Sequence, residues 1–474
     1  MACHLAIDIG ASSGRHIVGQ VVDGHMELTE VYRFENGLTR KGSHLCWDID
    51  ALAESVVAGL AAAKEAGFAP ATIGIDTWAV DYVLLDDRDQ RIGDAVGYRD
   101  SRTYGVKDAL ELSGILSFAE HYARTGAQYQ QFNTYQLCAL SRESRGQLDG
   151  AKSLLMVPDY LGFVLTGVKA QEYTNASTTA LVNAKTCEWD DALIDLLNLP
   201  RNVFQPIHMP GESLGRLNPD IVKRVGFDAE VVLVASHDTG SAWLAVPASD
   251  ERAVYVSSGT WSLVGVENRA LICTPQSAAA NLTNEGGAYG TYRYLKNIMG
   301  LWMIQNVRRE LGEVTGVAPT WDELVKAAEE ARAAGFSAVV DADDQEFLAP
   351  ASMLTALRTV CARSGQPVPE TMGQYALTVY DSLAADYART VAQLHELTGV
   401  DYTSINIVGG GSNNDYLNQA TADACGLPVF AGPTEGTALG NLMVQFIHSG
   451  EYASLEEARA AIKQSFEIKE YLPR

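Results

Sequence analysis

The chain of 474 residues contains 35 lysine and arginine side chains and 59 aspartate and glutamate side chains, which gives a formal net charge of −24. Hydrophobic residues make up 47% of the chain and charged residues 20%, a composition that is typical of globular proteins and excludes wholesale disorder. An acidic chain repels phosphate backbones and anionic lipid, so neither a nucleic-acid partner nor a membrane partner is expected.

Two absences from the sequence bear on location and redox state. No apolar stretch approaches the ~18 residues that a membrane span needs, and no basic segment followed by an apolar one opens the chain. The seven cysteines form no C-x-x-C pair, which speaks against a zinc site and a disulfide framework. We therefore expect a cytoplasmic protein with reduced thiols.

The first elements predicted in chain order are three strands joined by tight turns, then a helix and a further strand. Their residues are 5–9, 15–22, 26–34, 50–66 and 72–75. Hairpin-linked strands followed by a helix and a strand predict a mixed α/β sheet and not an all-parallel one.

A comparable pattern begins about halfway along the chain. Strands are predicted at 253–256 and 261–266, with a turn of small residues between them. The resemblance to the first hairpin predicts an internal duplication with a spacing of about 250 residues. We therefore expect two domains, 1–245 and 246–474.

Three helices are predicted in the second half. Thr320 and Glu323 form a capping-box signature before the helix expected at 324–334. Apolar residues at three- and four-residue spacing predict a helix over 376–394, ended by Gly399. A last helix is expected after Ser454.

The turn Asp8-Ile-Gly-Ala-Ser-Ser-Gly-Arg15 is the first candidate for chemistry. A carboxylate at a strand end, followed by small residues, can hold a hydrated magnesium ion beside nucleotide phosphates. It is not a Walker loop, because no Gly-Lys-Ser/Thr follows. The alternative is a hairpin turn that requires glycine.

Two further motifs come in the middle of the chain. Val256-Ser-Ser-Gly-Thr-Trp-Ser262 repeats the small-residue turn, and is otherwise an ordinary strand connection. His237-Asp238-Thr239 follows an apolar strand at 231–235, where open α/β sheets place ligands. Asp238 there can accept a hydroxyl proton during phosphoryl transfer, or can simply cap the helix that follows.

The last candidates concern the base of a nucleotide and a sugar. The glycines of Ile407-Val-Gly-Gly-Gly-Ser-Asn-Asn414 allow a flat ring to lie on the backbone, or form a plain loop. Trp78 and Tyr82 can pack on a sugar whose hydroxyls bind Asp76, Asp81 and Asn297. Alternatively, Trp78 belongs to the core, which is the commoner position for tryptophan.

In this order the four motifs resemble those of the FGGY carbohydrate kinases. Further similar stretches are Gly74 to Asp86, Tyr98 to Arg102, Pro158 to Tyr160, Glu172 to Ala176 and Leu295 to Trp302. Recognisable matches run from about residue 5 to about residue 445. The resemblance extends to the members that phosphorylate L-rhamnulose on its carbon-1 hydroxyl.

The resemblance implies two ribonuclease H-like α/β domains, as in actin and other sugar kinases, with ATP and a sugar bound in a cleft between them. It assigns Asp238 as catalytic base and Asp8 to magnesium. At the sugar it places Ala79, His237, Asp238, Thr239 and Asn297. At ATP it places Ala11, Ser12, Ser13, Gly14, Arg15, Thr260, Gln305 and Gly410.

Departures and alternatives remain at this point. The family usually has glycine where this chain has Ala79, which bears on how closely the sugar fits there. Thr421 replaces a cysteine that some relatives have near Cys425, so no local disulfide is expected.

Three alternative functions stay open. They are a kinase for L-fuculose or xylulose, a partner-binding ATPase of the same fold, and a non-catalytic sugar sensor. The protein is expected to be a monomer or a homodimer.

Overall fold

The computed structural model describes residues 2–128 and 134–474. The chain forms two compact units, each built from several segments. The first contains Met1–Ala245, Glu267–Tyr294 and Thr437–Ser465, and the second contains Val246–Val266, Leu295–Gly436 and Phe466–Arg474. Two segments from the second half of the sequence thus belong to the first unit. The division of function at residue 245 stays a prediction.

The main sheet of the first unit has six strands in the order β15-β16-β6-β1-β2-β3. The bounds are β1 His4–Ile9, β2 Ser13–Val22, β3 His25–Glu35, β6 Thr72–Thr77, β15 Ser213–Arg216 and β16 Glu230–Val232. Strands β1, β2 and β3 are antiparallel neighbours, whereas β6 runs parallel to both β1 and β16. The predicted mixed sheet is confirmed.

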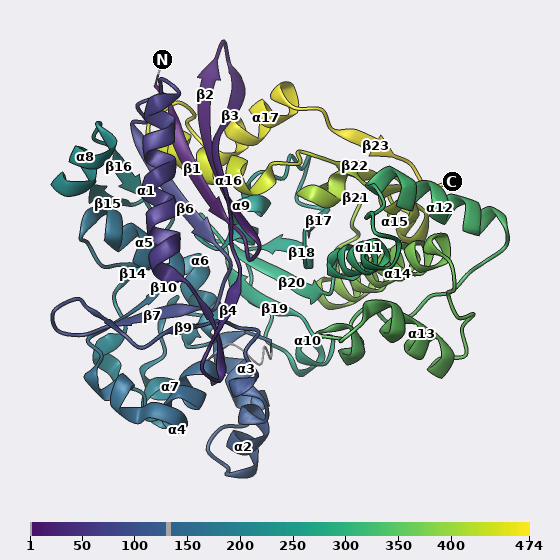
Figure 1. Ribbon diagram of the computed structural model, residues 1–474, viewed down its shortest axis with the longest axis horizontal. Helices are drawn as coiled ribbons and strands as arrows, with labels where there is room; N and C mark the ends of the chain where they lie inside the picture. Colours follow the sequence, from purple (N-terminus) through teal and green to yellow (C-terminus); the bar gives the residue numbers. More distant parts are fainter. Residues whose placement is uncertain (1, 129–133) are drawn as a thin grey trace. The chain divides into compact units, whose positions relative to one another are not determined.

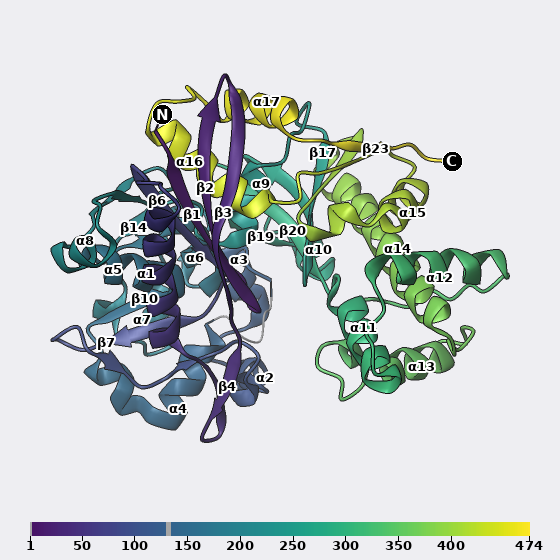
Figure 2. The same ribbon diagram turned by 45° about the horizontal axis from the view of Figure 1, so that its top comes forward.

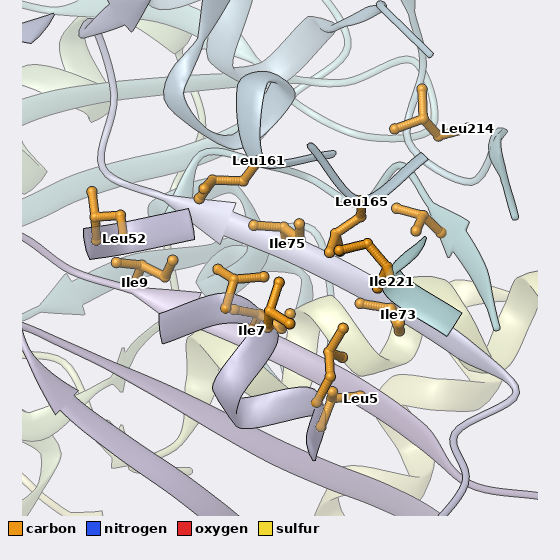
Figure 3. Close-up of a cluster of buried hydrophobic side chains, with 14 of the residues drawn as sticks. Leu5, Ile7, Ile9, Leu52, Ile73, Ile75, Leu161, Leu165, Leu214 and Ile221 are labelled. Atoms are coloured by element: carbon orange, nitrogen blue, oxygen red, sulfur yellow. The ribbon is translucent and has the colours of Figure 1, made fainter. Parts of the chain in front are cut away.

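One face of this sheet carries an apolar core. Because side chains alternate along a strand, Leu5, Ile7 and Ile9 share a face of β1. Figure 3 shows them beside Ile73 and Ile75 of β6. Three helices cover this face (Figure 1), α1 Ile49–Glu65, α5 Val157–Thr166 and α8 Pro219–Val225.

The opposite face is polar and lies against α16 (Gly436–His448). Asn441 Nδ2 donates to Asp76 Oδ2 at 2.6 Å, and Gln445 Nε2 donates to Asn441 Oδ1 at 2.7 Å. Thr72 Oγ1 donates to Gln445 Oε1 at 2.6 Å and lies 2.7 Å from His4 Nδ1. A hydrogen-bonded chain thus runs under the sheet from Asp76 to His4, and satisfies polar groups that would be costly to bury alone.

The other elements before residue 250 connect and flank this sheet. They are β4 Leu38–Lys41, β5 His44–Trp47, β7 Tyr82–Leu85, β8 Arg91–Ile92, β9 Ala95–Val96, α2 Val106–Leu112, α3 Phe118–Thr125, α4 Tyr135–Gly150, β10 Ser153–Met156, β11 Gln171–Glu172, α6 Tyr173–Ala176, β12 Val182–Asn183, β13 Glu188–Trp189, α7 Asp191–Leu196, β14 Ile207–His208 and α9 Asp238–Leu244.

A second sheet has seven strands in the order β19-β20-β18-β17-β21-β22-β23. Their bounds are β17 Ala253–Ser258, β18 Ser262–Asn268, β19 Thr283–Gly286, β20 Tyr292–Ile298, β21 Ser404–Val408, β22 Val429–Ala431 and β23 Lys469–Tyr471. Strand β17 pairs antiparallel with β18 and parallel with β21, which in turn runs parallel to β22. This repeats the arrangement of β2, β1, β6 and β16, as expected for an internal duplication.

The helices predicted in the second half are present. Besides α16, the α-helices of this half are α10 Pro275–Ala279, α11 Trp302–Thr315, α12 Trp321–Ala333, α13 Met353–Arg363, α14 Met372–Thr398, α15 Asp415–Cys425 and α17 Leu455–Ser465. Thr320 and Glu323 form the capping box of α12, and α14 ends at Gly399 with a φ of 71°. Figure 2 shows α14 between α12 and α15, which explains the long buried stripe of α14.

All seven cysteine thiols are free. Among the described residues, no helix has the length and apolar character needed to cross a membrane.

Candidate active site

Two acidic side chains lie on neighbouring parallel strands of the first unit. Asp8 and Asp76 are register partners in the β1–β6 pair, and alternation places both on the polar face. Asp76 is fully buried, and its Oδ1 has no hydrogen-bond partner among the described residues. Burial, reinforced by the charges of Asp8 and Asp238, raises the pKa of Asp76 well above its usual value. Asp76 therefore favours its protonated form.

Asp238 begins α9 near the carboxyl ends of these strands. Its neighbour His237 forms a parallel bridge with Thr77 at the end of β6. Oδ1 of Asp238 accepts hydrogen bonds from the Thr239 N–H at 2.6 Å and from Thr239 Oγ1 at 3.2 Å. No hydrogen bond within the described chain reaches Oδ2, and 32% of the side chain is exposed. A carboxylate oxygen that accepts no hydrogen bond from the protein can accept a proton from a ligand.

The environment of Asp238 raises its proton affinity. Desolvation by burial has the largest effect and raises the pKa of the carboxyl group. His237 lowers this pKa, while the charge of Asp8 raises it. A carboxylate with a raised pKa is a stronger base, so the position suits general-base chemistry.

His237 lies among charged side chains of the first unit. Its Nδ1 is 3.0 Å from Arg293 Nη2 and 3.3 Å from Glu285 Oε2. Its Nε2 is 3.4 Å from Asp238 Oδ1. Arg293 is only 1% exposed, and its Nε donates to the Gly286 carbonyl at 3.0 Å. The imidazole is thus contacted on both ring nitrogens.

A buried glutamate holds the segment that leads into His237. Glu172 Oε2 accepts hydrogen bonds from the Ser236 N–H at 3.0 Å and from Ser236 Oγ at 2.6 Å. The same oxygen accepts from Thr174 Oγ1 at 2.6 Å, and Thr174 Oγ1 accepts from the His237 N–H at 3.2 Å. Burial raises the pKa of Glu172, although these donors oppose the shift. Glu172 and Thr174 therefore hold the backbone of Ser236 and His237, which leads into Asp238.

Sequence reasoning missed four residues of this arrangement, namely Glu172, Thr174, Glu285 and Arg293. The stretch 172–176 stands out in the sequence only for its similarity to family members. The roles of the four residues depend on contacts with Ser236 and His237, which lie 48 to 64 positions away, and spacing along a chain does not reveal such contacts.

The first small-residue turn joins β1 to β2. The Gly10 N–H donates to the Ser13 carbonyl at 2.9 Å, and the Asn36 N–H donates to the Ser12 carbonyl at 3.0 Å. A Cβ at Gly14 would lie 2.2 Å from the ring of Phe34, so a larger residue does not fit there. Arg15 Nη2 donates to Asp8 Oδ2 at 2.9 Å. The turn brings together Asp8 and the predicted residues Ala11 to Arg15.

The second small-residue turn joins β17 to β18 in the second unit. The Gly259 N–H donates to the Trp261 carbonyl at 2.9 Å, which closes the turn as Gly10 does in the first. The Trp302 N–H donates to the Thr260 carbonyl at 3.0 Å, so α11, which carries Gln305, begins against this turn. Two of the predicted nucleotide residues, Thr260 and Gln305, are therefore brought to one place.

The glycine loop after β21 packs against the same turn. A Cβ at Gly411 would lie 1.9 Å from Ser258 Oγ, and one at Gly409 would lie 2.9 Å from the Ser258 carbonyl oxygen. Gly409 also has a φ of 88°. By contrast, no atom lies within 4 Å of a Cβ built at Gly410. The loop therefore approaches the turn closely and leaves open space at Gly410. The remaining predicted residue of this unit, Asn297, is a half-buried residue of β20.

The proposed sugar-packing role of Trp78 and Tyr82 requires correction. Trp78 is 6% exposed, packs on Trp47 with ring centroids 4.1 Å apart, and belongs to the apolar core. Tyr82 is buried in a second apolar cluster. The core alternative for Trp78 is confirmed.

The expectation that Asp76 and Asp81 bind sugar hydroxyls is also wrong, because both carboxylates are buried. Asp81 accepts from Trp47 Nε1 at 2.6 Å and from Trp78 Nε1 at 3.0 Å. It also accepts from the Tyr98 N–H at 3.1 Å and from Gln136 Nε2 at 2.8 Å. Burial nevertheless raises the pKa of Asp81 to about 6.

Ala79 lies in the loop between β6 and β7. It is half-buried, and its carbonyl accepts from the Asp81 N–H at 2.9 Å. The next residue, Val80, has a φ of 68°, a conformation that is strained for a β-branched side chain. Such strain is found at functional sites, where the surrounding structure enforces it.

The fold is that of the carbohydrate kinases. A xylulose kinase from Lactobacillus acidophilus superposes with a TM-score of 0.81, covering 100% of this chain and 94% of that one at 18% identity. A Plasmodium falciparum glycerol kinase with ADP gives a TM-score of 0.78 over 100% and 94% at 15% identity.

The chain belongs to the FGGY family of carbohydrate kinases. The model of the N-terminal domain of this family matches residues 3–245, and that of the C-terminal domain matches residues 254–449. Sugar kinases of this family use ATP as the phosphoryl donor.

Named relatives cover nearly the whole chain. A rhamnulokinase of Halalkalibacterium halodurans is 48% identical over 99% of this chain and 98% of its own. The rhamnulokinases of Oceanobacillus iheyensis and Bacillus subtilis are 45% and 41% identical over 99% of this chain and cover 98% and 95% of their own lengths.

Proposed function

We propose that this protein transfers the γ-phosphoryl group of ATP to the carbon-1 hydroxyl of L-rhamnulose. One observation carries the choice of sugar: relatives named rhamnulokinase match at 48% identity over 99% of the chain. The alternative ketoses, L-fuculose and xylulose, have weaker support, because the similar xylulose kinase is only 18% identical and speaks for the fold alone. A partner-binding ATPase would not need a carboxylate placed as Asp238 is.

In this proposal Asp238 is the general base. Its Oδ1 is occupied by two hydrogen bonds from Thr239, so Oδ2 is the atom that accepts the proton of the attacking hydroxyl. Its raised pKa strengthens it for this task. The sugar would be bound by Ala79, His237, Thr239 and Asn297.

The nucleotide would be bound by two groups of residues. In the first unit these are Arg15 together with Ala11, Ser12, Ser13 and Gly14, and the small side chains of these last four leave the backbone accessible. In the second unit they are Thr260, Gln305 and Gly410, where the open space at Gly410 suits a flat base. We further propose that residues 1–245 and 246–474 act as the two functional domains.

Asp8 fits a magnesium ion that accompanies the nucleotide. Its carboxylate supplies the oxygen ligand that Mg²⁺ prefers, and it lies at the first small-residue turn beside the residues assigned to the phosphates. Within the described residues no group of three or more His, Cys, Asp or Glu side chains is arranged to hold a metal by itself. The ion would therefore depend on phosphate oxygens and water, and would neutralise charge on the phosphates.

A panel of ketoses tests this proposal. Purified protein is incubated with ATP, Mg²⁺ and L-rhamnulose, L-fuculose or D-xylulose, and ADP release is measured. We expect the highest kcat/KM for L-rhamnulose, with product phosphorylated at carbon 1. A higher kcat/KM for another ketose would make that ketose the substrate in place of L-rhamnulose. The absence of any sugar-stimulated ADP release would overturn the kinase assignment.

A further inference from the structure

His237 and Asp238 are adjacent, and each carries a side chain that can accept a proton. Both are assigned to the sugar in the proposed function, so their sequence positions alone do not say which one acts as the base. The contacts of the His237 imidazole show which of the two side chains can accept a proton. They come from Arg293 on β20, Glu285 on β19 and Asp238 on α9.

Arginine has only N–H groups and no lone pair that can accept a hydrogen bond. Arg293 Nη2 lies 3.0 Å from His237 Nδ1 in hydrogen-bonding geometry, so the hydrogen between these atoms belongs to the guanidinium. A hydrogen on Nδ1 would put two N–H groups against each other. Arg293 is 1% exposed and cannot turn to water to relieve that clash.

Glu285 holds the arginine in this place. Its Oε2 lies 3.1 Å from Arg293 Nη2, and the Arg293 Nε–H is used on the Gly286 carbonyl. The guanidinium is therefore held by an ion pair and by a hydrogen bond, and an Nη2 hydrogen is directed at the imidazole. A neutral imidazole has one hydrogen, which must then be on Nε2, the nitrogen 3.4 Å from Asp238 Oδ1.

We propose that Arg293 is a positioning residue that fixes the Nε2–H tautomer of His237. The only lone pair of the neutral ring is then occupied by Arg293, so His237 offers the sugar a hydrogen-bond donor and cannot act as the base. Asp238 Oδ2 is left as the one proton acceptor of the pair. This rests on the proposed function for the presence of the sugar, but the tautomer itself does not depend on any ligand.

The tautomer can be measured directly by nitrogen-15 NMR of the full-length protein labelled in its histidine rings. The His237 signals are assigned by their loss in His237→Asn. We expect Nδ1 to be unprotonated and Nε2 protonated at neutral pH. A protonated Nδ1 in the unaltered protein would overturn the proposal, whatever the outcome of the ketose panel.

Arg293→Met removes the donor and leaves the Glu285 carboxylate 3.3 Å from Nδ1. We expect the Nδ1 signal to move to the range of a protonated nitrogen, and Arg293→Lys to restore the unprotonated signal at least in part. Tyr292→Phe is the matched control, because it removes a hydrogen bond from the same strand to the Ala184 carbonyl and leaves His237 untouched. If Nδ1 stays unprotonated in Arg293→Met, another group sets the tautomer and the proposal fails.

Discussion

At the scale of single residues, the two oxygens of Asp238 differ. Oδ1 accepts two hydrogen bonds from its neighbour Thr239, while no hydrogen bond within the described chain reaches Oδ2. The hydrogen bonds to Oδ1 therefore orient the carboxylate and leave Oδ2 available to a ligand. A short local hydrogen bond orients the group, and longer-range contacts through Glu172 and Ser236 fix the backbone that carries it.

Asp238→Asn should remove the base and keep the shape of the site. The amide can still accept from Thr239 through its oxygen, so we expect sugar binding to persist. A general base contributes about 10²- to 10⁴-fold, and kcat should fall by that factor. Steady-state kinetics and sugar binding by calorimetry measure the two effects.

Asp228→Asn serves as the control for loss of a carboxylate, since Asp228 is exposed and pairs with Arg216. It should leave kcat unchanged. A nearly normal kcat in Asp238→Asn would show that water or another group accepts the proton.

At the scale of elements, helix α1 is fixed to the sheet by a contact that admits no side chain. A Cβ at Gly59 would lie 2.3 Å from three atoms of the His16 ring. That ring is fully buried and its Nε2 is 3.0 Å from the Val56 carbonyl oxygen. The glycine is thus a requirement of close packing between α1 and β2.

Gly59→Ala and Gly146→Ala form a matched pair of helix substitutions. Both replace glycine by the better helix former, which by itself favours the helix by up to about 1 kcal/mol. Gly146 in α4 has no atom within 4 Å of the added Cβ, so its variant should be stabilised. Gly59→Ala should instead be destabilised by about 2 kcal/mol through overpacking. Urea unfolding measures both, and equal changes in the two variants would contradict the packing argument.

Elements with a strong local pattern were predictable. The capping box of α12, the apolar stripe of α14 and the first hairpin follow from neighbouring residues, and all are present. Predicted ends differed by a few residues, as with α12, which begins at Trp321 and not at Leu324. Short strands such as β11 and β14 were not predicted, because two residues carry no period.

At the scale of the whole molecule, several carboxyl groups are buried and favour their protonated forms. Burial raises the pKa of Asp76, Asp81, Asp159 and Glu172. Each such group binds protons more tightly in the folded than in the unfolded chain. Its contribution to stability is therefore present at low pH and is lost as the pH rises through the folded pKa.

Asp81 allows this effect to be isolated. Its pKa rises from 3.8 to about 6 on folding, so its contribution should be lost as the pH rises from about 4 to 6. A shift of about two pKa units corresponds to roughly 3 kcal/mol. Asp81→Asn does not titrate, so the free energy of unfolding of the unaltered protein should fall relative to that of the variant over this range. Denaturant unfolding at pH 4 and pH 6.5 measures the difference, and parallel pH profiles would contradict it.

The family of the whole chain was predictable because four motifs occur in one order. The composition of the compact units was not. Segments 267–294 and 437–465 join the first unit through contacts such as Arg293 with His237 and Asn441 with Asp76. The residues of each pair are far apart in sequence, and neither segment carries a local pattern that predicts which residue the other contacts. Trp78 was ambiguous for the same reason, since only its contact with Trp47 distinguishes core from sugar site.

The polar face beneath β1 and β6 has a consequence for synthesis. A ribosome releases these strands early, but Asn441 and Gln445, which complete the chain of hydrogen bonds from Asp76 to His4, come near the end. Until α16 emerges, the nascent sheet exposes its polar underside to water and to chaperones. A premature stop after residue 435 would therefore leave Asp76 and Thr72 without these hydrogen-bond partners. This sheet is begun long before α16 is made, and its polar face is covered only afterwards.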